Sequence, residues 1–562
     1  MGAYRTINPA TGQTVAEYAV IGDADVADIV ARSHTAYRKY RELPLAERTG
    51  ILARAAQLHR DRIDELSALL TLEVGKPVTQ ARGEVELVAS IYQYYADHAE
   101  AFLTDETLDI VGGGEALVRT EPIGPLLGIM PWNYPYYQVA RFVAPNLALG
   151  NTIILKHARN CPQSALAIER VLHDAGLPAD AYINAFVDSR QIAGIIADPR
   201  VQGVSLTGSE KAGSAVGEVA GRHMKKVVLE LGGSDPFIVL EDADVDAAVA
   251  AGVRGRIANG GQACTASKRF IVVDAVYDEF SRKFIDAITK ITPDDPTDPD
   301  TFLGPLASAD AGKELEELVE DAVAKGATLH IAPGARREGA FYPPSVLTGV
   351  TPPMRAYEEE LFGPTAVVYR VPSPQAAVAL ANESPFGLSS SVFTQDPLAA
   401  AQIARELEVG MVWINSTSRS APDLPFGGVG VILAGLAVLL YLRGDKIQRV
   451  VDEKSSVEDI RSATVIDFVY AIILFGFKEV STIPMSTTWV FIGLLAGRER
   501  RCCRAERAER PGHRVRHGAD GAARNLLSVP RGAFRPRGAS DRCPYRGLPR
   551  SLGRALQDQG RL

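Results

Sequence analysis

The chain has 562 residues, of which 46% are hydrophobic and 23% are charged, and its formal net charge at pH 7 is −8. This length allows two or three domains with large buried cores. Acidic side chains outnumber basic ones in residues 1–497, which gives no sign of a nucleic-acid-binding surface. The opening residues, MGAYRTINPATGQ, lack a charged segment followed by an apolar run, so we expect no secretory signal and a cytoplasmic main body.

Residues 22–105 have the pattern of helices. Apolar side chains recur at helical spacing before a Gly-Lys-Pro stop, at Ile51, Leu52, Ala55, Leu58, Ile63, Leu66, Leu69 and Leu70. We therefore expect an N-terminal helical segment.

Short apolar runs then alternate with helical stretches. Between residues 124 and 240 the runs are GPLLGIMP, NTIILKH, YINAFV, VQGVSLTG and KVVLEL. A second series of strands and helices follows Cys264 and contains KRFIVVD, FIDAITK, GATLHI, TAVVYRV, SSVFT and MVWIN. The alternation predicts an α/β fold of two doubly wound lobes with a cleft between them, in which ligands bind at the carboxyl ends of the strands.

Several polar residues stand where such strands end. Cys264 lies in the glycine-rich turn NGGQACTASKR, Glu230 ends a strand before two glycines, and Asn133 lies in the proline-bounded loop of GIMPWNYP. Taken singly, each has an ordinary alternative: a small buried cysteine, a solvated acid and a turn-forming asparagine. Gly208 and Ser209 join a strand to a helix, where backbone N–H groups favour a pyrophosphate, although the full G-x-G-x-x-G spacing is missing.

Together and in this order, these segments resemble the aldehyde dehydrogenase superfamily, most closely its NAD(P)-dependent succinate-semialdehyde dehydrogenase branch. The resemblance covers about residues 4–430. The segments that carry it are PWNYP, NTIILKHA, LTGS, LELGGSDPF, GQACTASKR, EELFGP, NESPFGLSSSVFT and LPFGGVG.

The resemblance implies roles for three catalytic residues. Cys264 would attack the aldehyde to form a thiohemiacetal and later a thioester. The side-chain amide of Asn133 and the backbone N–H of Cys264 would stabilise the oxyanion, where one donor is typically worth about 3 kcal/mol. Glu230 would activate the water that hydrolyses the thioester to a carboxylic acid.

The resemblance also implies a nicotinamide nucleotide, either NAD or NADP, as cofactor. Its binding residues would be Trp132, Lys156, Gly208, Ser209, Leu231, Glu360 and Phe362. Where many family members read Lys-Pro-Ser/Ala-Glu, this chain reads KHAR, so Arg159 replaces a glutamate that often binds the ribose hydroxyls. A guanidinium can bind the 2′-phosphate of NADP, which a carboxylate would repel. Arg159 therefore predicts that the protein uses NADP at least as well as NAD. We expect no metal, because the five cysteines show no ligand spacing.

Arg141 suggests the substrate. It follows Asn133 by eight residues on a predicted helix, so its guanidinium could bind the distal carboxylate of succinate semialdehyde; the alternative is an arginine on the helix surface. Some relatives carry a second arginine six residues before the cysteine, where this chain has Ala258, and Arg256 lies on another turn. Another aliphatic or ω-carboxy aldehyde therefore stays open as the substrate.

By resemblance, residues 1–235 form a Rossmann-like cofactor-binding domain with a bridging or oligomerisation hairpin near 105–122. Residues 236–430 form a catalytic domain that is truncated at its end. Because the C-terminal strand of the family is missing, the homo-oligomer expected for the family is in doubt.

After residue 430 the sequence changes in kind. Residues 431–497 contain apolar segments, and the run Phe426–Leu442 approaches the length of a membrane span. Residues 498–562 contain 17 arginines and no lysine, which favours disordered sequence from a translated wrong frame over a nucleic-acid-binding tail. A membrane-associated fusion through 426–497 and an inactive chimera are the alternatives to an active enzyme.

Overall fold

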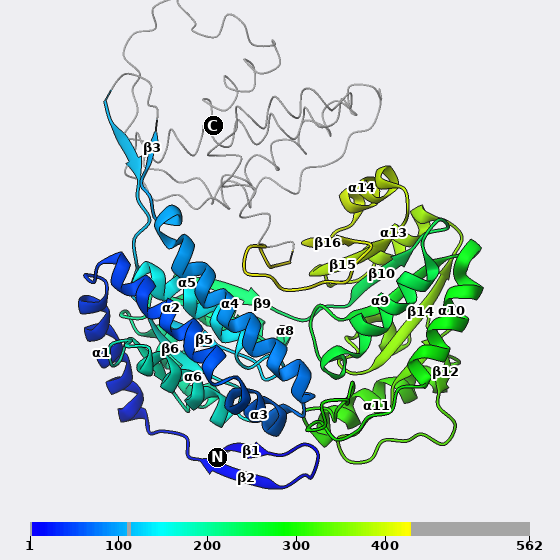
Figure 1. Ribbon diagram of the computed structural model, residues 1–562, viewed down its shortest axis with the longest axis horizontal. Helices are drawn as coiled ribbons and strands as arrows, with labels where there is room; N and C mark the ends of the chain where they lie inside the picture. The colour runs from blue at the N-terminus through cyan, green and yellow to red at the C-terminus, as the bar shows by residue number, and fades with distance from the viewer. Residues whose placement is uncertain (1–2, 109–113, 429–562) are drawn as a thin grey trace, which may run out of the picture. The chain divides into compact units, whose positions relative to one another are not determined.

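The computed structural model describes residues 3–108 and 114–428 (Figure 1). An antiparallel hairpin of β1 (Tyr4–Ile7) and β2 (Thr14–Tyr18) precedes the first helices. The helices are α1 (Asp23–Tyr40), α2 (Leu45–Asp61), α3 (Ile63–Val74) and α4 (Val78–Phe102). The predicted helical segment is therefore confirmed, and Gly75 ends α3 with a left-handed φ of 69°. An added Cβ at Gly75 would lie 2.8 Å from the Pro305 carbonyl oxygen, so the stop requires glycine.

The first large sheet has five parallel strands in the order β7-β6-β5-β8-β9. The strands are β5 (Pro125–Ile129), β6 (Thr152–Lys156), β7 (Tyr182–Asn184), β8 (Gly203–Thr207) and β9 (Lys226–Glu230). The helices between them are α5 (Tyr137–Leu149), α6 (Pro162–Asp174), α7 (Ser189–Ala197) and α8 (Glu210–Arg222). Leu126 and Leu155 pack with α2, α4, α5 and α6, while Leu127 and Ile154 pack with α1, α7 and α8. Alternate side chains thus bury both faces.

The second large sheet has seven strands in the order β12-β13-β14-β11-β10-β15-β16, and only β12 pairs antiparallel to its neighbour. The strands are β10 (Asp235–Val239), β11 (Ser267–Val273), β12 (Thr328–Ile331), β13 (Ser345–Thr348), β14 (Thr365–Val371), β15 (Ser389–Phe393) and β16 (Met411–Ile414). Its helices are α9 (Val245–Ile257), α10 (Asp274–Thr289), α11 (Ala309–Ala324), α12 (Arg355–Glu358), α13 (Pro374–Asn382) and α14 (Pro397–Glu406). Helices α9 and α10 cover one face, and α11, α13 and α14 cover the other.

These two sheets confirm the predicted α/β fold. The sequence analysis did not predict the hairpin of β1 and β2, and it also missed two strands of the large sheets: β10, which begins Asp-Pro, and β13, which has four residues. Asp and Pro are rare in strands, and a four-residue run is too short for a clear period, so both depend on their neighbours in the sheet.

A small antiparallel sheet of β3 (Glu106–Leu108) and β4 (Ala116–Val118) lies within the predicted hairpin near 105–122. Its bridging role and the domain boundaries stay predictions. No helix within residues 3–108 and 114–428 combines the length and apolar character needed to cross a membrane. The predicted apolar segments of 431–497 and the arginine-rich residues 498–562 lie outside the described residues.

Candidate active site

Cys264 lies in a turn between the short helix η1 (Ala258–Gly261) and β11. The buried guanidinium of Arg256 holds both ends of this turn, because it donates hydrogen bonds to the carbonyls of Gly261 (2.6 Å) and Ser267 (3.3 Å). An added Cβ at Gly261 would lie 2.3 Å from Arg256 Nη2, so the close approach requires glycine. Arg256, which the sequence analysis placed on a different turn from the second arginine of some relatives, therefore supports the backbone of the turn.

Asn133 joins the loop after β5 to the cysteine turn. Its side-chain Nδ2 donates to the carbonyl of Gln262 (3.0 Å), and its Oδ1 accepts from the backbone N–H of Tyr134 (3.1 Å), which fixes the orientation of the amide. In return, Asn259 Nδ2 donates to the Asn133 carbonyl (2.9 Å). Because an amide nitrogen carries two hydrogens, one donor of Asn133 stays available beside the turn.

A buried ion pair supports the loop that contains Asn133. Glu84, on α4, pairs with Lys76, and its Oε1 accepts from the backbone N–H groups of Tyr136 (2.9 Å) and Tyr137 (3.1 Å) at the start of α5. A carboxylate at this helix start satisfies free N–H groups and complements the helix dipole. The sequence analysis did not identify Lys76 or Glu84, since nothing local links them to residue 136.

Glu230 ends β9, as predicted, and the two glycines after it bring the chain against Cys264. An added Cβ at Gly233 would lie 2.3 Å from the Cys264 carbonyl oxygen. Burial raises the pKa of Glu230, and the charge of Arg141 opposes this shift. The role of Glu230 as a base stays a prediction.

The Cys264 thiol is partly exposed in its turn. Burial raises its pKa to about 11, while the charges of Lys268 and Arg141 lower it. Because the thiolate is the nucleophilic form, reaction at neutral pH requires a base or a further positive charge near the sulfur.

Arg141 lies on α5 and is half-buried. Its Nη2 donates to Thr207 Oγ1 (3.4 Å), and its guanidinium stacks over the ring of Phe426 (4.3 Å). The charge of Arg141 reaches both Glu230 and Cys264, so the structure brings the three residues together. Its contact with substrate stays a prediction.

The predicted cofactor residues lie on the neighbouring loops. Trp132 meets Phe362 edge to face with ring centroids 5.6 Å apart, and Ser209 caps α8 by accepting from the Ala212 N–H (3.4 Å). Leu231 lies over Gly213, where an added Cβ would come within 2.5 Å of Leu231 Cδ2.

Lys156, at the end of β6, and Arg159 form a pair of cations. Burial and, to a smaller extent, the charge of Arg159 lower the pKa of Lys156 to about 8. Among the described residues, neither side chain has a carboxylate partner within ion-pair distance. Two close cations without an acid fit an anionic group such as the 2′-phosphate of a nucleotide.

Glu360 is ion-paired to Lys268, with Nζ and Oε1 2.8 Å apart. Lys268 was missed as a functional candidate, although it stands inside the quoted segment GQACTASKR. Within residues 3–108 and 114–428, no group of three or more His, Cys, Asp or Glu side chains is arranged to hold a metal ion.

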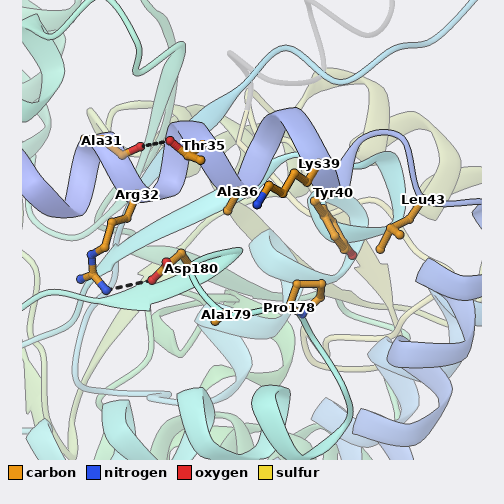
Figure 2. A pocket seen from close by; sticks show the side chains of 10 residues that line it. All are labelled: Ala31, Arg32, Thr35, Ala36, Lys39, Tyr40, Leu43, Pro178, Ala179 and Asp180. Atoms are coloured by element: carbon orange, nitrogen blue, oxygen red, sulfur yellow. Dashed lines mark hydrogen bonds and ion pairs between the residues drawn. The ribbon is translucent and has the colours of Figure 1, made fainter.

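A pocket of about 300 Å³ lies elsewhere, between α1 and the loop that precedes β7 (Figure 2). Arg32 and Asp180 form an ion pair at 2.9 Å, and the apolar wall includes Tyr40, Leu43 and Pro178. No candidate site residue from the sequence lines it, so this pocket is separate from the cysteine turn.

Two doubly wound sheets, with a cysteine turn leading into one and a helix start at the edge of the other, are the arrangement of a two-lobed dehydrogenase. The sequence profile of the aldehyde dehydrogenase family matches residues 2–435. The chain therefore belongs to the aldehyde dehydrogenase family, which confirms the resemblance seen in the sequence.

Three relatives illustrate the similarity. A succinate-semialdehyde dehydrogenase (NADP(+)) of Deinococcus radiodurans is 54% identical over 428 residues, which cover 76% of this chain and 89% of the relative. A succinate-semialdehyde dehydrogenase (NADP(+)) 1 of Mycobacterium tuberculosis is 44% identical, with 75% and 93% covered. The crystal structure of succinic semialdehyde dehydrogenase from Streptococcus pyogenes in complex with NADP+ matches with a TM-score of 0.74 and 40% identity, covering 76% of this chain and 94% of that chain.

Proposed function

We propose that this protein oxidises succinate semialdehyde to succinate with NADP+ and water. The observation that supports the proposal is the hydrogen bond of Asn133 to the Cys264 turn, together with the position of Arg141, whose charge acts on both Glu230 and Cys264. Family membership supports the reaction type, and the names of the relatives support the substrate and the cofactor.

The reaction begins when Glu230 accepts the proton of the Cys264 thiol. The sulfur then forms a bond to the carbonyl carbon, and the electron pair of the C=O bond moves to oxygen. The free hydrogen of Asn133 Nδ2 and the backbone N–H of Cys264 donate hydrogen bonds to this oxyanion. The oxyanion re-forms the C=O bond as hydride leaves the carbon, which produces a thioester on Cys264.

When bound, the nicotinamide nucleotide supplies the hydride acceptor. Once Glu230 has released its first proton to solvent, it takes a second from water, whose oxygen attacks the thioester carbon. The C–S bond breaks, the Cys264 thiolate leaves, and the carboxylic acid departs. Arg141 holds the distal carboxylate of the substrate throughout and so keeps the aldehyde carbon at the sulfur.

For the cofactor, we propose that Lys156 and Arg159 bind the adenosine ribose and its 2′-phosphate. Gly208 and Ser209 would bind the pyrophosphate. Around the nicotinamide riboside the binding residues would be Trp132, Leu231, Glu360 and Phe362. An Arg159→Glu variant should lose at least about tenfold in kcat/KM for NADP+ while keeping that for NAD+, because a charge reversal repels the phosphate. Unchanged discrimination between the two nucleotides would remove Arg159 from this role.

The substrate is tested with succinate semialdehyde and butanal, which have the same carbon-chain length but differ in the distal carboxylate. NADPH formation by the purified chain should vanish in Cys264→Ala. Arg141→Met should raise KM for succinate semialdehyde about 10- to 100-fold, as expected for a lost charged hydrogen bond, and leave butanal nearly unchanged. Arg222→Met, at an exposed ion pair with Glu218, is the matched control. An equal effect of Arg141→Met on both aldehydes would argue against the carboxylate contact.

The residues beyond 430 receive a separate test. A chimera replaces them with the corresponding C-terminal segment of the Deinococcus radiodurans relative. An inactive intact chain and an active chimera would locate a defect in the C-terminal segment, whereas equal activity would show that the site works with the native end.

A further inference from the structure

Lys268 is almost completely buried beside the cysteine turn. It is the second residue of β11, and its side chain is 1% exposed. Its Nζ donates to the carbonyls of Ala263 (2.8 Å) and Cys264 (3.0 Å) and lies 2.8 Å from Glu360 Oε1. Two of the three N–H donors of the ammonium thus bind carbonyls of the turn, and the Glu360 carboxylate lies at ion-pair distance from the same nitrogen.

These contacts join two segments that are far apart in the sequence. The carbonyls of Ala263 and Cys264 belong to the cysteine turn, whereas Glu360 belongs to the segment before β14. The other oxygen of Glu360 lies close to the backbone at Gly232, because a Cβ added there would come within 2.7 Å of Oε2. The carboxylate of Glu360 is thus confined between Lys268 and the backbone after β9.

We propose that Lys268 is a positioning residue that couples the placement of the Cys264 backbone to that of the Glu360 carboxylate. Nucleotide binding at Glu360 and the reactivity of Cys264 would then both depend on one buried ammonium. The expected effect on nucleotide binding at Glu360 rests on the proposed function, whereas the expected effect on the reactivity of the Cys264 thiol does not.

The electrostatic environment of Cys264 sets the direction of the expected effect. The charged or titratable groups that act on the thiol come from several elements: Tyr134, Arg141, Asp235, Lys268 and Glu360. Lys268 and Arg141 lower the pKa of the thiol, while Asp235 and Glu360 raise it. Asp235 itself is buried, with a pKa raised to about 7, so it offsets the cations only in part.

Two substitutions should shift the pH profile of Cys264 alkylation in opposite directions. Lys268→Met removes a positive charge and should move the pH profile of Cys264 alkylation to higher pH. Glu360→Gln removes the negative charge that neutralises Lys268 and should move the profile to lower pH. A shift of one pH unit changes the alkylation rate about tenfold at a pH below the pKa of the thiol, since the thiolate reacts.

The first experiment uses the full chain without nucleotide. Iodoacetamide labelling is followed by mass spectrometry of the peptide that contains Cys264, and Lys283→Met is the control because this lysine lies at exposed ion pairs on α10. Opposite shifts for Lys268→Met and Glu360→Gln support the proposal, whereas shifts in the same direction, or none, overturn it. If Lys268→Met fails to fold by circular dichroism, the Glu360→Gln shift alone decides.

The second experiment measures the Kd for NADP+ by titration calorimetry. Each single variant should weaken binding about tenfold, and the double variant should be no weaker than either, because both act through the same pair. Additive losses in the double variant overturn the coupling. If the two variants show the expected alkylation shifts but the wild-type chain forms no NADPH, the proposed function is contradicted while the effect of Lys268 on the Cys264 thiol stays supported.

Discussion

Replacing Gly233 with alanine tests whether the backbone after β9 sets the position of Cys264. The added Cβ would lie 2.3 Å from the Cys264 carbonyl oxygen and 3.2 Å from its carbonyl carbon. Neither atom is the end of a flexible side chain, and Lys268 holds the same oxygen at 3.0 Å.

The size of the effect follows from these distances. An ordinary carbon contact begins at 3.4 Å, so the two backbones must separate by about 1 Å. A displacement of about 1 Å at a reacting group costs about 100-fold in rate, or about 3 kcal/mol of activation free energy. Steric overpacking should lower the free energy of unfolding by a further 1 to 3 kcal/mol, roughly.

The assay is kcat/KM for NADPH formation, together with urea unfolding of the same preparation. Gly194→Ala is the control, because an added Cβ there meets no atom within 4 Å and lies within α7. That control should keep its activity and gain about 0.5 to 1 kcal/mol of helix stability. If Gly233→Ala keeps kcat/KM within about twofold of wild type, the argument from close backbone contact is refuted.

Three further predictions concern stability. Burial lowers the pKa of His157 to about 4, so between about pH 6.5 and pH 4 the imidazole takes up a proton in the unfolded chain but not in the folded chain. As the pH falls through this range, the wild-type protein should lose up to about 3 kcal/mol of unfolding free energy relative to His157→Gln. Urea titrations that show the same pH dependence for both proteins would contradict this prediction. Glu84→Gln leaves Lys76 buried without its anion and should cost about 3 to 5 kcal/mol, partly recovered in the double variant with Lys76→Met; no recovery would argue against the pair. Phe237→Ala, in a cluster with Phe270 and Phe393, should cost about 3 to 5 kcal/mol, and a loss below about 1 kcal/mol by calorimetry would show that the cavity collapses.

Much of the fold could be predicted because its signals are local. Strands β5, β6 and β8 are apolar runs bounded by turn residues, and such runs predict buried parallel strands without knowledge of their partners. Strand β10 carries the same burial but begins Asp-Pro, so its sequence alone does not distinguish it from a loop.

The candidate site divides in a similar way. Cys264, Glu230 and Asn133 stand in motifs short enough to read from the sequence, and the resemblance to a family assigned their expected roles. The supporting contacts of these residues join distant positions: Asn133 to Gln262, Glu84 to Tyr136, and Lys268 to Glu360.

The sequence by itself therefore determined the class of fold, the family and the candidate nucleophile, since each depends on residue types at short spacing. Only the tertiary structure decided that Lys268 contacts both the Cys264 turn and Glu360, that Arg256 supports the backbone of this turn, and that the charge of Arg141 acts on the Cys264 thiol. A buried charge needs a partner of opposite charge or a hydrogen bond, and in the folded chain this partner can come from a residue far away in the sequence. No local sequence pattern predicts such a contact.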